Sequence, residues 1–211
     1  MRKRFHYASM ETVKGKRVSI MELREKIIEE AEQLYREYGL KFTLQDIAAR
    51  LHIAKKTIYR FYPSKDDLCA AVIDHAFEKI QAAKSRILAD ETLSLKEKAE
   101  RVLIAMPDTY AGMDLRSLTD LPQQYPKAAS ALQKHLQSDW DPVIALLEEG
   151  RREGVFRKVS YPVLRTMIAS AITSFMESDV LEKESVSYSE GLREMMVILM
   201  KGIAYDKDDQ N

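Results

Sequence analysis

The chain has very little of what disulfide-bonded and metal-binding proteins require. Cys69 is the one cysteine among 211 residues, so no disulfide can form within the chain, and the four histidines are scattered. Because no His or Cys spacing typical of a zinc site occurs, we expect no metal and no other cofactor. Cys69 lies among apolar residues of a helical pattern, which favours a packed thiol over a reactive one.

Long apolar runs and catalytic motifs are also missing. No run approaches the ~20 apolar residues that cross a bilayer, and the basic start lacks the apolar core of a signal peptide. We therefore expect a cytoplasmic protein that does not enter a membrane. No phosphate-binding glycine loop, nucleophile elbow or pair of carboxylates on one helical face appears, so an enzyme is not expected. Strand-like alternation is absent too, which predicts an all-α fold class.

Charge is unevenly distributed although the formal net charge is zero. Up to Lys65 the chain has 15 Lys and Arg against 8 Asp and Glu, and the remainder has 18 against 25. A basic front part followed by an acidic rear part is typical of a DNA-binding head on a body that does not bind DNA.

The most informative stretch runs from Phe42 to Lys65. Thr43 is a preferred N-cap with Asp46 three residues on, and apolar residues then repeat at helical spacing as far as Leu51. A turn follows, and a second helix is predicted from about Lys55 until Pro63 stops it. Two short helices joined by a tight turn form a helix-turn-helix, whose second helix can enter a DNA major groove.

The second helix has a distinct inner and outer side. Ile58 and Tyr62 fall on the inner side, while Lys56 and Arg60 lie four residues apart on the outer side. Lysines in the first turn of a helix oppose its macrodipole, but a phosphate backbone nearby reverses the sign of that effect. The alternative is an ordinary solvated surface, on which paired lysines are common.

This stretch resembles the TetR family of bacterial one-component transcription regulators. The resemblance is carried by Ile47, Ala48 and Leu51 and by the run IAKKTIYRFYPSK that ends at Lys65, and it extends over residues 21–80. It implies that Gln45 can reach a base and that the following residues contact DNA, mostly at phosphates: Thr43, Lys55, Lys56, Thr57, Tyr59 and Lys65. Arg60 joins them on the outer side. The sequence departs from the family at the turn, where His52 replaces the usual Gly, and at the second cap, where Ala54 supplies no hydroxyl.

We divide the chain into three parts. Residues 1–20 form a basic arm, for which an irregular or frayed start is expected; it either lies in a DNA minor groove or is a solvated tail. Residues 21–66 form the DNA-binding domain, which begins with an amphipathic helix ended by Gly39. Residues 67–211 form a helical effector-binding and dimerisation domain, in which Pro142 either kinks a helix or separates two.

The family resemblance also implies a homodimer in which the last two helices of each chain pair. In the last helix, a wide apolar stripe favours the same interpretation, whereas the alternative is that the stripe packs only within its own chain. The predicted interface residues are Met167, Ala171, Ser174, Met195, Met196, Leu199 and Ile203. A two-fold dimer would read a pseudo-palindromic operator on double-stranded DNA.

An unidentified small-molecule effector is the remaining partner that the resemblance implies. Large, adaptable or aromatic side chains near irregular segments are candidates for an apolar pocket, although at helical spacing such residues are more often ordinary core. These candidates are Met106, Tyr110, Met113, Tyr125, Trp140, Phe175 and Met176. The sequence thus predicts a repressor that a largely apolar effector releases from DNA. The alternative is a DNA-binding adaptor whose rear half binds a protein partner.

Overall fold

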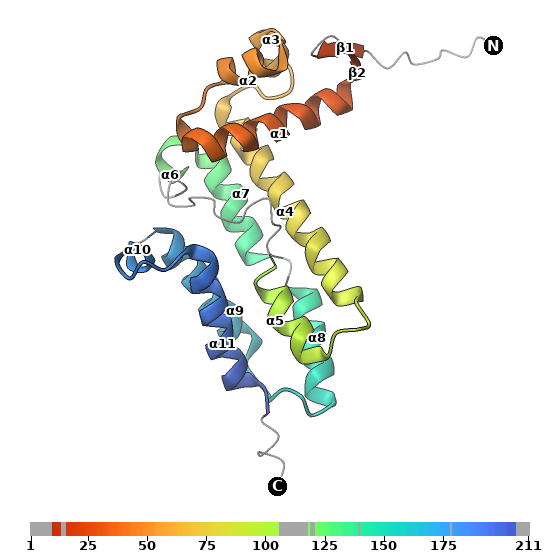
Figure 1. The fold of residues 1–211 in the computed structure, drawn as a ribbon, viewed down its shortest axis with the longest axis vertical. Helices are drawn as coiled ribbons and strands as arrows, with labels where there is room; N and C mark the ends of the chain where they lie inside the picture. Colours follow the sequence, from red (N-terminus) through yellow and green to blue (C-terminus); the bar gives the residue numbers. More distant parts are fainter. Residues whose placement is uncertain are drawn as a thin grey trace, which may run out of the picture. The chain divides into compact units, whose positions relative to one another are not determined.

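Helices account for most of the structure, as the sequence predicts. The computed structural model in Figure 1 describes residues 10–13, 16–105, 118, 121–138, 140–177 and 179–205. Within these residues, one short hairpin and one isolated bridge are the departures from helices and their connections. The predicted all-α fold class is therefore confirmed, with a correction near the N-terminus.

The regular elements follow one another along the chain in this order. The hairpin and the first helices are β1 (Met10–Val13), β2 (Lys16–Ser19), α1 (Ile20–Tyr38), the 3-10 turn η1 (Gly39–Lys41), α2 (Leu44–Leu51), α3 (Lys55–Tyr59) and α4 (Lys65–Ala89). The later helices are α5 (Leu95–Leu103), α6 (Leu121–Gln124), α7 (Pro126–Gln137), α8 (Asp141–Arg152), α9 (Tyr161–Glu177), α10 (Val180–Lys183) and α11 (Tyr188–Ile203).

The hairpin is a correction to the expected frayed start. β1 and β2 pair antiparallel, from Met10 opposite Ser19 to Val13 opposite Lys16, and β2 leads directly into α1 (Figure 1). Each strand has four residues, which is too short for an alternating pattern to be recognised in the sequence. Residues 1–9 lie outside the described residues, so the arm predicted there stays a prediction.

Side-chain caps determine where several helices begin. In a capping box, a Ser or Thr accepts a hydrogen bond from the backbone N–H three residues on, and the acidic residue there accepts one from the cap's own N–H. This satisfies donors that the first turn of a helix leaves unpaired. Within the described residues, such boxes pair Ser19 with Glu22, Thr43 with Asp46, Ser94 with Glu97 and Ser187 with Glu190.

The described residues form two compact units. The first contains those up to His75 together with those between Asp120 and Ala131, and the second contains the rest. In the first unit, α2 packs on α1 and α3 packs on α2. The buried side chains there include Leu23, Ile27, Ala31, Leu34, Ile47, Ala48, Leu51, Ile58, Tyr62 and Leu68. The predicted domain limits at residues 20 and 66 stay predictions.

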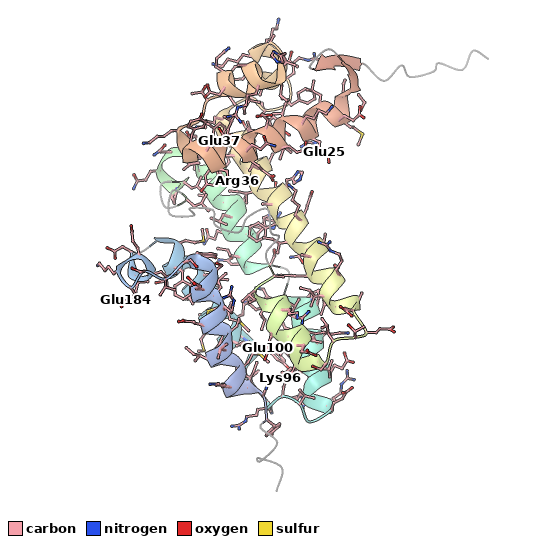
Figure 2. All side chains as sticks on the ribbon, in the orientation of Figure 1. Glu25, Arg36, Glu37, Lys96, Glu100 and Glu184 are labelled. Carbon is pink, nitrogen blue, oxygen red and sulfur yellow. The ribbon has the colours of Figure 1, made fainter. Side chains whose placement is uncertain are left out.

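The first helix shows how burial divides its two sides. Leu23 and Ile27 are buried, whereas Glu25, Arg36 and Glu37 are exposed (Figure 2). Burying one Leu or Ile side chain contributes about 1.5–3 kcal/mol, so this apolar face anchors the unit. The amphipathic helix predicted before Gly39 is confirmed.

In the second unit, the loop after α8 closes onto the end of α11. Phe156 pairs with Ala204, and the N–H of Arg157 donates to the carbonyl of Ile203 at 2.7 Å. Phe156 also lies so close to Gly150 that an added Cβ would be 2.2 Å from its ring, so glycine permits this approach. Pro142 stands in the first turn of α8, so it separates two helices and does not kink one.

The less common side chains are built into the fold. Cys69 is buried, and burial raises the pKa of its thiol to about 11, which confirms the packed thiol. His135 stacks on Phe77 with ring centroids 4.4 Å apart.

Over the part of the chain that the structure describes, no group of three His, Cys, Asp or Glu is placed to hold a metal ion. None of the helices described is long and apolar enough to cross a membrane.

Candidate nucleic-acid interface

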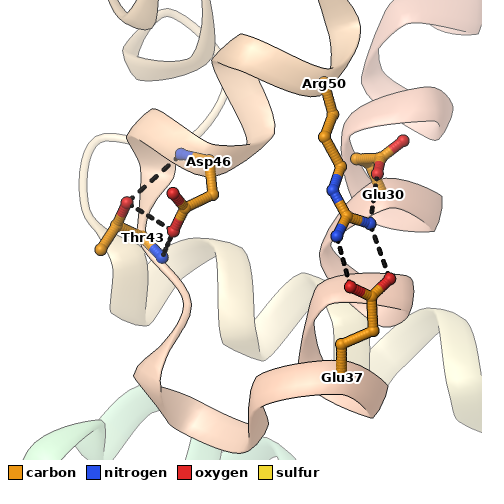
Figure 3. Close-up of polar contacts among 5 residues, drawn as sticks. All are labelled: Glu30, Glu37, Thr43, Asp46 and Arg50. Carbon is orange, nitrogen blue, oxygen red and sulfur yellow. Dashed lines mark hydrogen bonds and ion pairs between the residues drawn. The ribbon is translucent and has the colours of Figure 1, made fainter.

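The first helix of the predicted pair is held at its start by its own cap. The Thr43 hydroxyl accepts from the Asp46 N–H at 3.2 Å and donates to the Asp46 carboxylate at 2.8 Å (Figure 3). The Thr43 N–H donates to the same carboxylate oxygen at 2.8 Å. These bonds from the Thr43 hydroxyl and backbone lower the pKa of Asp46. The predicted cap is confirmed, and the hydroxyl predicted to contact DNA already has a partner within the chain.

Arg50 ties α2 to α1, a contact that sequence reasoning missed. Its guanidinium donates two hydrogen bonds to the Glu37 carboxylate, one of them at 2.8 Å, and a third to Glu30 at 3.2 Å (Figure 3). The bond from Arg50 lowers the pKa of Glu37. A bidentate Arg–carboxylate pair fixes orientation as well as proximity. Arg50 therefore sets how α2 lies across α1, but its partners are 13 and 20 residues away.

The turn between the two helices has the geometry that the sequence requires. His52 adopts a left-handed conformation with φ of 54° and ψ of 45°, and the Ile53 N–H donates to the Ala48 carbonyl at 3.0 Å. Histidine is among the residues that tolerate this region best after glycine. The replacement of the usual Gly by His52 is thus compatible with the fold. Ala54 occupies the N-cap of α3 without a side-chain hydrogen bond.

The second helix has the predicted inner and outer sides. Ile58 is fully buried and Tyr62 is 2% exposed, while Lys56 and Arg60 are exposed. The helix itself ends at Tyr59, before the limit predicted from Pro63, because the next residues form a turn in which the Phe61 and Tyr62 N–H groups both donate to the Ile58 carbonyl.

We call the helix pair α2 and α3 the reader. Its exposed side combines basic, aromatic and amide side chains. Tyr59 is 43% exposed, and the Lys55 ammonium lies 5.7 Å from the centre of its ring. Gln45 is exposed on the first turn of α2, whereas Thr57 is half-buried. Such an arrangement suits phosphates, which bind lysine and tyrosine side chains, and base edges, which bind amides.

Lys65 does not share this surface. Its ammonium donates to the carbonyls of Leu40 and Phe42, both at 2.5 Å. It also lies 4.3 Å from the centre of the Phe42 ring and 5.0 Å from that of Tyr125. Two of the three ammonium N–H groups therefore have acceptors within the protein, and the contact of Lys65 with a phosphate stays a prediction.

The predicted pocket residues fall into three groups. Met106, Tyr110 and Met113 lie outside the described residues. Tyr125 belongs to the first unit, and Trp140, Phe175 and Met176 belong to the second. Trp140 is half-buried, packs against the core of the second unit and donates from its indole N–H to the Leu136 carbonyl at 3.4 Å. Met176 is buried and Phe175 half-buried.

The predicted interface residues of α11 face mostly inward. Met196 and Ile203 are buried in the core of the second unit, and Met195 and Leu199 are half-buried against it. Part of the apolar stripe therefore packs within its own chain, and the interface predicted for these residues stays a prediction. On α9, Met167 and Ser174 are exposed and Ala171 is half-buried. Sequence reasoning missed the exposed apolar residues Val163, Val197 and Ile198.

Comparison with known proteins agrees with this geometry. Residues 27–72, which contain α2, α3 and the turn between them, match the family model for bacterial regulatory proteins of the tetR family. A curated Bacillus subtilis (strain 168) protein, the uncharacterized HTH-type transcriptional regulator YvaF, is 26% identical over 87% of this chain and 96% of its own length. Residues 27–72 thus match a TetR-family DNA-binding region, and the curated protein that the chain resembles over most of its length is an HTH-type transcriptional regulator.

Solved structures show that the likeness in fold covers both units. A TetR transcription regulator from Haloarcula marismortui ATCC 43049 is similar with a TM-score of 0.66, at 17% identity over 88% of this chain and all of that one. The regulator FadR from Bacillus subtilis in complex with stearoyl-CoA is similar with a TM-score of 0.58, at 20% identity over 85% of this chain and 98% of that one. The TetR-family fold thus extends well beyond the region that the family model matches.

The cap at Thr43 gives a test of how α2 is held. Thr43→Val keeps the branched shape but removes the hydroxyl, so it should lower the free energy of unfolding by about 1 kcal/mol. Because the pKa of Asp46 is lowered in the folded state, the capped carboxylate stabilises the fold fully above the ordinary aspartate pKa of about 4. That contribution is lost as the pH falls through the folded-state pKa.

The difference between wild type and Thr43→Val, measured by urea unfolding, should therefore shrink as the pH is lowered from about 5 to about 2. Thr43→Ser, which keeps the hydroxyl, serves as the control and should unfold like the wild type. A valine variant as stable as the wild type at neutral pH would show that the cap does not hold α2.

Proposed function

We propose that this TetR-family regulator is a cytoplasmic repressor that binds a pseudo-palindromic operator as a homodimer and that a small, largely apolar effector releases. The observation that carries the proposal is the exposed face of α2 and α3. Burial of Ile58 and Tyr62 leaves Lys56 and Arg60 on the solvent side of α3. An exposed basic ridge on the second helix of such a pair is the geometry that enters a major groove.

We assign the contacts according to exposure and chemistry. Gln45, Lys55 and Lys56 read base edges, because an amide or an ammonium discriminates between base pairs. Tyr59 and Arg60 bind phosphates, which position the reader without selecting a sequence. Thr57, which is half-buried, and the capping residue Thr43 contact DNA at the edge of this surface.

Single substitutions separate these roles. Lys56→Ala should change which sequence is preferred, by about 1–3 kcal/mol for each base contact removed. Tyr59→Phe should weaken binding to every duplex. Arg60→Ala should also reduce the log–log salt slope by about one unit in each subunit for every phosphate that the guanidinium neutralises. Binding is measured in a salt titration on an operator selected from random DNA and on unselected DNA.

The matched control is Lys96→Ala, which removes the same charge from an exposed position on α5. It should bind both duplexes like the wild type. If Lys56→Ala and Tyr59→Ala both remain folded and keep full operator affinity, then α3 is not the DNA reader.

The homodimer is proposed to form through the exposed faces of α9 and α11. Val163 and Met167 are 56% and 53% exposed on α9, and Val197 and Ile198 are 51% and 71% exposed on α11. These two helices pack on each other within the chain, and we propose that their exposed apolar residues form one surface. Contiguous apolar surface of this kind marks an interface. Met167 was already predicted from the sequence to lie in the interface, and Val163, Val197 and Ile198 extend that prediction.

A double substitution tests this surface. Val197→Glu with Ile198→Glu places two charges where a partner would bury them, so the protein should become monomeric while keeping its helicity. Val180→Glu, which changes an apolar residue that is 47% exposed on α10, is the control. Sedimentation should show a dimer for the wild type and the control. A wild type that is monomeric at micromolar concentration contradicts the assignment.

Release by an effector is proposed from the family likeness, in which the FadR structure contains stearoyl-CoA. A ligand that binds one arrangement of the folded protein better than another shifts the population by its differential affinity. We place its site in the second unit, near Trp140, Phe175 and Met176.

Lipophilic cations, phenols and acyl compounds are suitable probes. An effector should raise the melting temperature of the free protein and weaken its binding to the operator. A change in Trp140 fluorescence should accompany binding. A broad panel that changes neither quantity would favour an adaptor that binds a protein partner.

A further inference from the structure

Three consecutive residues at the start of α4 bind segments of the first unit that precede or follow α4 in the chain. Lys65 binds the connection between α1 and α2, Asp66 binds the start of α7, and Asp67 binds both its own cap and a side chain of α7. All of these partners belong to the same compact unit, although α6 and α7 lie more than 50 residues further along the chain.

Asp66 caps the start of α7 from another helix. Its carboxylate accepts from the Lys127 N–H at 3.1 Å and from the Ala128 N–H at 3.0 Å. These are the second and third residues of α7, which begins with Pro126. A carboxylate at this place satisfies two donors of the first turn and complements the positive end of the helix dipole. The start of α7 is therefore fixed by α4.

Asp67 adds to the contact between the first turn of α4 and the start of α7. Its carboxylate pairs with the Lys127 ammonium at 2.5 Å and accepts from the Ser64 hydroxyl at 2.6 Å. The bond from Lys127, followed by that from Ser64, lowers the pKa of Asp67. Ala128 is fully buried and Leu121 is 1% exposed, so the backbone of α6 and α7 is also held by packing.

Lys65 contacts both the segment that leads into α2 and the residue that precedes α7. Its ammonium donates to the carbonyls of Leu40 and Phe42, and Phe42 immediately precedes the cap of α2. The same ammonium lies 5.0 Å from the ring centre of Tyr125, the residue before α7. One side chain thus contacts both the entry to α2 and the entry to α7.

We propose that Lys65 and Asp66 are positioning residues for DNA binding, which hold the entry of α2 and the start of α7 on the first turn of α4. The orientation of the reader then depends on residues 121–128 as well as on α1. Two of the three Lys65 N–H groups donate to carbonyls within the protein, so in this proposal Lys65 supports the reader through those bonds and not through a phosphate. The inference rests on α2 and α3 being the DNA-contacting helices.

Asp66→Ala is the direct test, with Glu78→Ala as a control that removes the same charge from an exposed position on α4. Measured where circular dichroism shows both variants folded, Asp66→Ala should weaken operator binding about tenfold, in the usual range of coupling between sites. The ratio of operator to unselected DNA affinity should fall as well, because a misplaced reader no longer fits the base edges, whereas its general attraction to phosphates remains. Hydrogen exchange at the Lys127 and Ala128 amides should become faster.

The control should change none of these quantities. Asp66→Asn keeps one oxygen that can accept an amide, so it should lie between wild type and Asp66→Ala, and it provides the comparison if the alanine variant does not fold. A folded Asp66→Ala or Asp66→Asn that exchanges faster at Lys127 and Ala128 but binds operator like Glu78→Ala would overturn the inference.

Lys65→Met separates positioning from phosphate binding. It keeps the apolar stem but removes the ammonium, so operator affinity should fall while the log–log salt slope stays at the wild-type value. A slope flatter by about one unit per subunit would instead show a phosphate contact and refute the assignment. If Lys56→Ala and Tyr59→Ala leave DNA binding unchanged, the assignment of α2 and α3 as the DNA-binding helices is wrong. If these two variants weaken DNA binding while the Asp66 variants do not, only the positioning role of Lys65 and Asp66 is wrong.

Discussion

The burial of one side of α3 determines which side chains this short helix presents to DNA. α3 has five residues, too few to be stable alone, so it depends on Ile58 and on Tyr62 just after it to hold it against the unit. With those two side chains inside, helical spacing leaves Lys56 and Arg60 outside. Lysines at the start of a helix oppose its dipole, and an anionic partner such as a phosphate reverses the sign of this effect.

Apolar burial and polar contacts have different parts in this arrangement. Burial of apolar side chains, including those of the α1 face, stabilises the fold, but apolar contacts are weakly directional. The orientation of α2 comes from Arg50, which binds Glu37 with two hydrogen bonds, and from Lys65, which holds the chain just before Thr43. The reader is thus placed by a small number of charge-assisted hydrogen bonds, each of which has a defined geometry.

Much of the reader could be predicted because its signals are local. The cap of α2 needs only Thr43 and Asp46, three residues apart, and the turn needs one residue that tolerates a positive φ, which His52 does. The spacing of Ile58 and Tyr62 was enough to assign the inner side of α3. The end of α3 was less predictable, because a turn ends the helix at Tyr59, before the limit that Pro63 would set.

What could not be predicted depends on partners distant in the sequence. The bonds from Lys65 to backbone carbonyls were not predicted, since nothing local shows that the carbonyls near Phe42 lie within its reach. The capping of α7 by Asp66 joins residues about 60 positions apart. In α11, periodicity identified an apolar stripe but could not show that Met196 packs inside while Ile198 remains exposed.

Hydrogen exchange with and without the selected operator tests the central claim most directly, because it reports every segment of the unmodified chain at once. The account predicts that DNA slows exchange over residues 43–60, which contain α2 and α3, and leaves α5 and α8 as they are in the free protein. Slower exchange elsewhere in the chain, with no change over residues 43–60, would contradict it.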